Sequence, residues 1–216
     1  MRSIRNWRMT AMGHDKLFQK RAAELRRAES TRQLRIILIV CEGSKTEPNY
    51  FKAFPENQRV YDEIDIQGMG YNTVSLVKKA IQLRNEAQKN RRPYQEVWCV
   101  FDRDSFPLES FNEALALAKR EKIRCAYSIE AFEIWYLLHF YYCDTALSRT
   151  QYSEKLTVAL DAEYLKNDTK MYERLKDKMG KAIQNAKKLY TFQYKKTIKD
   201  QNPITTVFEL VEKLQS

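Results

Sequence analysis

The chain has 216 residues, 44% of them hydrophobic, which is enough to bury one substantial core, and we expect one main domain. Its 38 Lys and Arg against 28 Asp and Glu give a formal net charge of +10, which favours polyanionic partners such as nucleic acid but also fits a solvated surface. No apolar run of about 18 residues and no signal-peptide core occurs, so we expect a cytoplasmic protein without a membrane span. The four cysteines and two histidines form no zinc motif.

Residues 1–33 form a basic N-terminal arm, rich in Arg and Lys. Within it, segment 18–30 can be helical but has only a weak apolar face. A solvated arm and an arm that contacts nucleic acid both remain open interpretations.

The next part of the chain alternates apolar, strand-like runs with helical segments. The run LRIILIV is rich in β-branched residues, which is typical of a parallel strand covered on both faces. Strands that alternate with helices predict an α/β fold with a mostly parallel, four-stranded, Rossmann-like sheet and flanking helices. The predicted strands are 34–40, 60–67, 95–101 and 123–129, and the predicted helices are 46–54, 73–90, 108–121 and 130–143.

After about residue 145 only helical patterns follow, at 153–165, 170–190 and 204–215. We expect these helices to pack on the α/β core rather than to form an independent domain. The predicted organisation is therefore a basic arm at 1–33, an α/β core at 34–145 and a helical C-terminal part at 146–216.

Carboxylates follow three of the four predicted strands. In open α/β sheets ligands bind outside the carboxyl ends of the strands, so these side chains should converge on one rim. This convergence is the main functional signal in the sequence. The residues concerned are Glu42 and Glu47 after the first strand, Asp102 and Asp104 after the third, and Glu130 and Glu133 after the fourth.

So many carboxylates on one rim would repel one another unless a cation lay among them. Mg²⁺ suits such a site, because it prefers oxygen ligands and needs only one or two carboxylates; Mn²⁺ is an alternative. A carboxylate-bound Mg²⁺ can polarise a phosphodiester, while a free carboxylate or a metal-bound water transfers the proton. An acidic pocket on a basic protein therefore suggests cleavage of nucleic acid.

Helix capping is a simpler explanation for some of these residues. Ser44 and Glu47 match a capping box, and Asp104 with Ser105 matches the cap of the following helix. The two glutamates after the fourth strand could serve only as partners of a helix dipole. Glu42 has no capping role in this register, so it is the strongest candidate for a chemical role.

Basic residues interleaved with aromatic ones mark the segment 166–199, where Tyr172, Tyr190, Phe192 and Tyr194 lie among the lysines. This pattern fits a nucleic-acid surface and equally a solvated helix face with buried tyrosines. The predicted nucleic-acid-binding residues are Lys45, Arg103, Lys181, Lys187, Lys188, Lys195 and Lys196.

The chain resembles the RloB/AbiLii family, which is encoded beside restriction-modification and abortive-infection loci of bacteria. The resemblance spans about residues 34–214 and rests on CEGSKTEPNYF, GMGYNTVSLVKKA, VFDRDSF, SIEAFEIWYLLHF and NPITTVFELVEKL, in that order. The first and third motifs also resemble the Toprim pattern, a glutamate after strand one and a DxD after strand three. That fold is shared by topoisomerases, primases and OLD-type nucleases and uses Mg²⁺.

The resemblance implies roles for the acidic residues. Glu42 matches the Toprim glutamate, which acts as a general acid/base or metal-linked group, and Asp102 and Asp104 match the DxD metal ligands. Glu47 and Glu133 match acidic positions of the family motifs. The chain departs from the pattern before the fourth-strand helix, where it reads SIEAFE and we would expect Asn-Pro.

The resulting hypothesis is a Mg²⁺-dependent Toprim-type nuclease that acts on DNA or RNA, with tRNA among the candidates, in antiphage defence. Glu42, Glu47 and Glu133 are the predicted catalytic residues. The family is often paired with an AAA-type ATPase, which is the expected partner, since this chain has no P-loop of its own. A homo-oligomer is left open. The alternative is a non-catalytic subunit that binds nucleic acid or the ATPase.

Overall fold

The computed structural model describes residues 19–21, 35–54, 61, 63–68, 73–103 and 107–215. The chain separates into two compact units, residues 1–34 and 35–216. In the first unit the described residues, 19–21, are helical and exposed. The predictions for the rest of the arm and for Asp104 lie outside the described residues. Everything below concerns the second unit.

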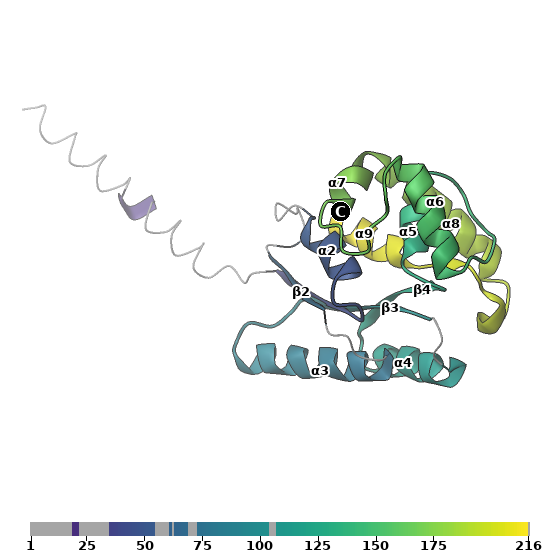
Figure 1. Ribbon diagram of the computed structural model, residues 1–216. Coiled ribbons are helices and arrows are strands. Elements are labelled where there is room, and N and C mark those ends of the chain that lie inside the picture. Colours follow the sequence, from purple (N-terminus) through teal and green to yellow (C-terminus); the bar gives the residue numbers. More distant parts are fainter. Residues whose placement is uncertain are drawn as a thin grey trace, which may run out of the picture. The chain divides into compact units, whose positions relative to one another are not determined.

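The second unit is built on a five-stranded sheet in the order β2-β1-β3-β4-β5 (Figure 1). Strands β1 to β4 pair in parallel, and β5 runs antiparallel to β4. The mostly parallel α/β architecture is thereby confirmed. The strands are β1 Ile36–Cys41, β2 Glu63–Gly68, β3 Glu96–Asp102, β4 Arg124–Ile129 and β5 Ile204–Thr205.

The fifth strand was not expected, because residues 204–215 read as one helix. Helix α9 (Val207–Gln215) begins only after β5. The backbone of Thr206 donates to the Tyr127 carbonyl over 2.8 Å, and its hydroxyl accepts from the Tyr127 N–H over 2.9 Å. β-branched residues suit a sheet edge, and pairing with β4 overrides the helical pattern here.

Helices cover both faces of the sheet (Figure 1). Alternate residues of β1 separate the two cores: Leu38 and Val40 pack with α3 and α4, whereas Ile37 and Ile39 pack with the helices on the other face. All six residues of β1 are buried, as a strand covered on both faces requires. The helices are α2 Thr46–Lys52, α3 Thr73–Lys89, α4 Leu108–Arg120, α5 Glu133–Leu137, α6 Arg149–Leu160, α7 Met171–Leu175, α8 Met179–Gln193 and α9, with 3₁₀ turns η1 Lys176–Lys178 and η2 Ile198–Asp200.

The helix predicted at 130–143 is much shorter in the structure, where α5 ends at Leu137. Backbone bonds from His139 to Tyr136 and from Phe140 to Leu137 close the chain into tight turns. The carbonyls of Leu138 and Phe140 accept hydrogen bonds from side chains of α8 instead of continuing the helix. Tertiary contacts with α8 therefore replace the last turns of the predicted helix.

The C-terminal helical part packs on the same face as α2 and α5 and contributes to the same apolar core. The predicted helix 153–165 occurs as α6, displaced toward the N-terminus, and the predicted helix 170–190 is broken into α7, η1 and α8. Within the described ranges, no helix is both long and apolar enough to cross a membrane.

His139 should make the stability of the fold depend on pH. It is fully buried beneath Trp135, its Nδ1–H donates to the Trp135 carbonyl over 2.9 Å, and burial lowers its pKa to about 4. The unfolded chain binds the proton near pH 6.5, so stability that is present above pH 6.5 is lost as the pH falls toward 4, by roughly 3 kcal/mol at most. Chemical denaturation of wild type and His139→Asn at pH 7.5 and 4.5 measures this loss. The variant should lose less than the wild type, and an equal loss in both proteins would contradict the assignment.

Candidate functional site

The site lies where the strand order of the sheet reverses. Strand β1 pairs with β2 on one side and with β3 on the other, so the crossovers leave in opposite directions between β1 and β3. Ligands of open α/β sheets bind at this switch point, outside the carboxyl ends of the strands. The backbone N–H of Glu42 donates to the Val100 carbonyl over 2.8 Å and continues the pairing by one residue. Glu42 and Asp102 are therefore held on neighbouring strand ends.

Asp102 is the most constrained of the predicted acidic residues. Its backbone N–H donates to Oε2 of Glu42 over 3.1 Å, and its own Oδ2 accepts from the Phe132 N–H over 3.1 Å. The same Oδ2 lies 4.0 Å from Nη2 of Arg149. Its other oxygen, Oδ1, is buried and has no hydrogen-bond partner among the described residues. A buried carboxylate oxygen without a partner is costly and calls for a ligand.

Glu47 reaches the same place from α2. Its side chain is only 5% exposed, and a Cβ atom at Gly43 would lie 2.2 Å from its Oε2, so only glycine allows the loop to pass so closely. The predicted capping box is wrong: the helix cap is Lys45, with no side-chain cap bond, and Ser44 is not the cap. The carboxylate of Glu47 instead accepts backbone hydrogen bonds from Gly43 and from its own N–H.

Glu133 enters from the first turn of α5 and is 4% exposed. Its Oε1 accepts from the Tyr164 hydroxyl over 3.1 Å and lies 3.6 Å from Nζ of Lys166. Glu130 does not line the pocket. The peptide bond between Ile129 and Glu130, where the resemblance predicts Asn-Pro, is cis.

Four predicted carboxylates thus meet in one pocket of about 250 Å³, which we call the carboxylate pocket. Of the other two predicted acidic residues, Glu130 does not line the pocket and Asp104 lies outside the described residues. The pocket is lined by Glu42, Gly43, Thr46, Glu47, Asp102, Phe132, Glu133, Arg149 and Lys166.

Comparison with known protein families adds one finding. The family described as RloB-like protein matches residues 37–214, which is most of the chain. The chain belongs to the RloB-like family. Neither the search of curated proteins nor the search of solved structures returned a match.

The carboxylate pocket of this RloB-like protein is electrostatically unfavourable by itself. Burial, and then the neighbouring charges of Glu47 and Glu133, raise the pKa of Asp102 well above its usual range, and Glu42 adds to the effect. The pKa of Glu47 is also raised, first by burial and then by Glu133. Like-charged carboxylates this close cannot all ionise cheaply without a cation.

The donor set fits Mg²⁺ in chemistry. Asp102 offers an unpartnered buried oxygen, and Glu42 lies beside it. The described residues contain no group of three or more His, Cys, Asp or Glu arranged to hold a metal. Mg²⁺ needs only one or two protein carboxylates and completes its shell with water and phosphate oxygens, so Asp102 and Glu42 could hold it.

Two basic residues that the sequence did not assign to the acidic rim complete the pocket. Arg149 opens α6, and Lys166 lies in the loop between α6 and α7. The Thr46 hydroxyl and the Asn49 amide fasten this loop to α2 by donating to the carbonyls of Lys166 and Asn167, over 3.0 and 3.2 Å. Lys166 begins the basic segment 166–199 that the sequence marks, but both cations come from the C-terminal part, where the strand-end rule has no force, so only the fold could place them in this pocket.

The predicted nucleic-acid-binding residues lie elsewhere. All seven are described, and none lines the carboxylate pocket. Lys45 is exposed at the start of α2, whereas the Arg103 guanidinium donates to the carbonyls of Ile198 and Lys199 and thereby holds η2. The remaining five lie on α8 or directly after it: Lys181, Lys187, Lys188, Lys195 and Lys196.

Removing one charge from the carboxylate pocket should stabilise the metal-free protein. Asp102→Asn keeps an acceptor for the Phe132 N–H but removes the buried charge. Because replacing an incompletely paired buried charge by a neutral group of the same shape is commonly stabilising, the unfolding free energy in EDTA at pH 8 should rise by about 1–3 kcal/mol. The raised pKa penalises the wild type only above the unfolded pKa of an aspartate, so the difference should disappear as the pH falls toward about 4.

Denaturant titration in EDTA at pH 8 and pH 4.5 measures this stability difference. Asp177→Asn is the matched control, since Asp177 is exposed on η1, and it should change the unfolding free energy very little. A less stable Asp102→Asn protein at pH 8 would show that the carboxylate is structurally required.

Proposed function

We propose that the carboxylate pocket is the active site of a Mg²⁺-dependent phosphodiesterase that cleaves DNA or RNA. The observation that carries this proposal is the buried, unpartnered Oδ1 of Asp102, at the switch point of the sheet and beside Glu42. Carboxylates and cations that line one small pocket suit a metal ion and a phosphate together.

The acidic residues divide into two groups in this proposal. Asp102 and Glu42 would hold Mg²⁺, with Mn²⁺ as a substitute, and the Toprim resemblance assigns the second aspartate of the DxD motif, Asp104, to the same metal. When bound, the metal polarises the phosphodiester and stabilises its leaving oxygen. Glu47, whose pKa is raised first by burial and then by Glu133, is suited to act as the general acid or base of the proposed reaction.

The basic residues bind the phosphate. Arg149, at 4.0 Å from Asp102, offers a guanidinium that can bind phosphate oxygens in a bidentate manner. Glu133 positions Lys166 through their 3.6 Å ion pair, and Tyr164 fixes Glu133 in turn. The substrate's backbone charge would thus face cations on the side of the pocket opposite the strand ends.

The wider role is proposed from the family resemblance. A glutamate after β1 and an aspartate at the end of β3, in a sheet with four parallel strands, support a Toprim-type site. Antiphage defence and an AAA-type ATPase partner follow from the resemblance alone. The basic balance of the chain, +10, supports a nucleic-acid substrate.

Cleavage assays test the activity directly. Plasmid, single-stranded DNA and total tRNA are incubated with the purified protein in Mg²⁺ or in EDTA. We expect one class to be cut, no cutting in EDTA, and a loss of at least about 100-fold in Glu42→Gln and Asp102→Asn, because each removes a proposed metal ligand. Glu154→Gln, an exposed glutamate of α6, is the matched control and should cut at the wild-type rate. Cleavage that persists in EDTA or in both pocket variants would rule out this mechanism.

Lys166 should act mainly on substrate binding. Lys166→Ala removes one phosphate contact while the carboxylates remain, so KM should rise roughly tenfold with a smaller change in kcat. Lys170→Ala, an exposed lysine nearby on the same loop, should leave both constants unchanged. Equal effects of the two variants would mean that the loop supplies only general positive charge.

One observation favours a second function, that of a non-catalytic binding subunit. The ion pairs of Arg149 with Asp102 and of Lys166 with Glu133 already neutralise part of the acidic rim, so its carboxylates could be structural. Calorimetric titration of the wild type and Asp102→Ala with Mg²⁺ and Mn²⁺ separates the two functions. No metal-dependent heat in the wild type would favour the binding subunit.

A further inference from the structure

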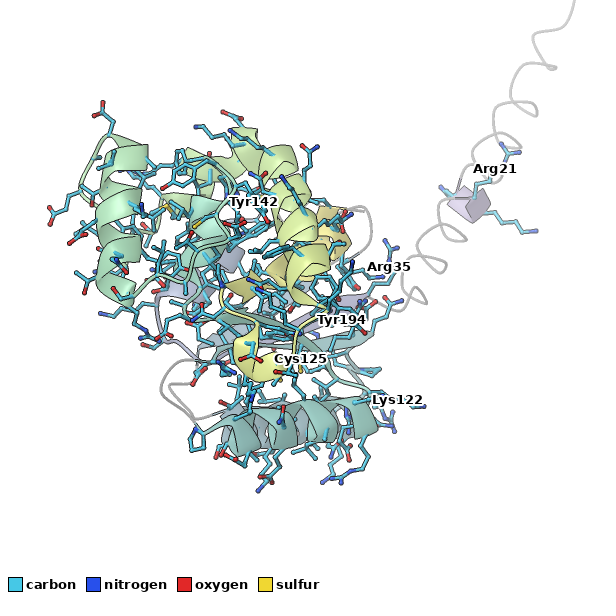
Figure 2. The ribbon with its side chains drawn as sticks, turned by 90° about the vertical axis from the view of Figure 1, so that its right-hand side faces the viewer. Arg21, Arg35, Lys122, Cys125, Tyr142 and Tyr194 are labelled. Carbon is cyan, nitrogen blue, oxygen red and sulfur yellow. The ribbon has the colours of Figure 1, made fainter. Side chains whose placement is uncertain are left out.

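Helix α8 carries a second pocket, whose lining residues differ in charge from those of the carboxylate pocket. It is an open pocket of about 600 Å³, and its lining contains lysines, one aromatic ring and no carboxylate. Figure 2 turns this side of the molecule toward the reader, with Tyr142 beside α8 and Tyr194 just beyond its end. We call it the α8 surface, and its lining residues are Lys187, Lys188, Thr191, Phe192 and Lys195.

Two aromatic side chains are unusually exposed here. Phe192 is 49% exposed and Tyr194 is 66% exposed, whereas most of the large aromatic residues of the described fold are buried. A single exposed aromatic residue is common on protein surfaces, so Phe192 points to binding only together with the lysines that line the same pocket. The Tyr194 ring lies 5.3 Å from that of Tyr190, at 31°, which holds it in place.

The order of residues along α8 and just after it places lysines beside an aromatic ring. Lys188 and Phe192 lie four residues apart and therefore share one face of α8, and Lys195, two residues past the end of the helix, lines the same pocket. The Lys196 ammonium lies 4.6 Å from the centre of the Phe192 ring, and the Lys188 ammonium lies 4.3 Å from that of Tyr142. Lysines therefore lie over both rings, and about half of the Phe192 side chain remains exposed beside them.

Few negative charges offset these lysines. Helix α8 contains no acidic residue, and the nearest ion pair at the surface is that between Lys187 and Glu212. No salt bridge of Lys188 or Lys195 occurs within the described residues. A surface of this charge attracts a polyanion. Among its lysines, Lys187 is the one that already forms an ion pair, with Glu212.

We infer that the α8 surface binds single-stranded nucleic acid, with Lys188 and Lys195 at the backbone phosphates and an unpaired base stacked on Phe192. A single strand offers both a phosphate every nucleotide and free base faces, and stacking on aromatic rings tolerates any base. A duplex hides its base faces, and an acidic peptide does not offer a flat ring beside each negative charge, as a single strand does. The inference goes beyond the proposed phosphodiesterase, because this binding requires no metal and no carboxylate.

Fluorescence anisotropy with a labelled oligo(dT) of about 20 nucleotides, in EDTA and over a range of salt concentrations, tests the inference. Lys188→Gln with Lys195→Gln should weaken binding about tenfold and lower the slope of log affinity against log salt by about 1.4, since each phosphate contact to a single strand contributes about 0.7. Phe192→Leu should weaken binding roughly 5- to 100-fold with the salt slope unchanged, because it removes stacking but no charge.

Matched controls lie on other faces of the fold. Lys78→Gln with Lys119→Gln removes the same charge from exposed positions of α3 and α4, and Tyr141→Leu removes another partly exposed ring, which is 40% exposed. Both controls should bind oligo(dT) as the wild type does. Thermal unfolding of every variant confirms that it is folded.

Each outcome decides for or against the inference. Weak or absent binding of the wild type, or a Phe192→Leu protein that binds as tightly as the wild type, overturns it. Equal weakening by the control lysines overturns it in favour of diffuse charge, and equal affinity for oligo(dT) and poly-glutamate overturns it in favour of an acidic protein partner. Cleavage is measured separately, so binding that survives in EDTA while no substrate is cut would leave the α8 surface supported and the phosphodiesterase refuted.

Discussion

The parallel pairing of β1 with β3 is the constraint on which the site depends. Both strands are buried, and their pairing leaves Glu42 and Asp102 at neighbouring ends, linked by the Asp102 N–H. The apolar cores on the two faces of the sheet hold the strands in this register. Their burial offsets the repulsion that the carboxylates create at the rim. Functional sites commonly carry such unfavourable local charge, and the stability of the surrounding fold keeps the charged residues in place.

The C-terminal helices convert this strand rim into an enclosed pocket. Their apolar residues complete the core above α2 and α5, and that packing brings Arg149 and Lys166 over the strand ends. The loop that carries Lys166 is fastened by Thr46, which follows Glu42 in the same motif. The segment that follows β1 therefore supplies both the carboxylate of Glu42 and the hydroxyl of Thr46, which fastens the loop that carries Lys166. A cluster of one charge would only repel, whereas acids facing bases can accommodate a metal ion and a phosphate.

The α/β core and the C-terminal part thus carry two chemically different surfaces. The carboxylate pocket is small and acidic, and the side chains of Glu47 and Glu133 are buried in it, which would suit the proposed chemistry on a fixed phosphodiester. The α8 surface is open, and lysines and rings line it, which suits variable contacts with a flexible polymer. A protein that holds a long substrate while it acts at one bond needs both kinds of surface. This separation of the two surfaces agrees with the finding that none of the seven predicted nucleic-acid-binding residues lines the carboxylate pocket.

The local pattern of the sequence determined the parallel sheet and most of the acidic rim. Continuous apolar, β-branched runs predict parallel strands covered on both faces, and a parallel sheet places the ends of its strands on one edge, so Glu42, Asp102 and Glu133 could be assigned to it. The structure also showed where local pattern fails. Residues 204–206 pair with β4 although they read as helix, and the helix after Glu133 stops early because α8 takes its carbonyls.

Only the tertiary structure decided which side chains lie opposite the acidic residues. Arg149 and Lys166 reach the pocket because helices distant in sequence pack on the sheet, and such packing depends on the shapes of whole surfaces. The same packing buried Tyr172 and left Phe192 and Tyr194 exposed, which the sequence left as equal alternatives. Periodicity specifies which side of a strand or helix is apolar, but the partner that covers it is settled by long-range contacts alone.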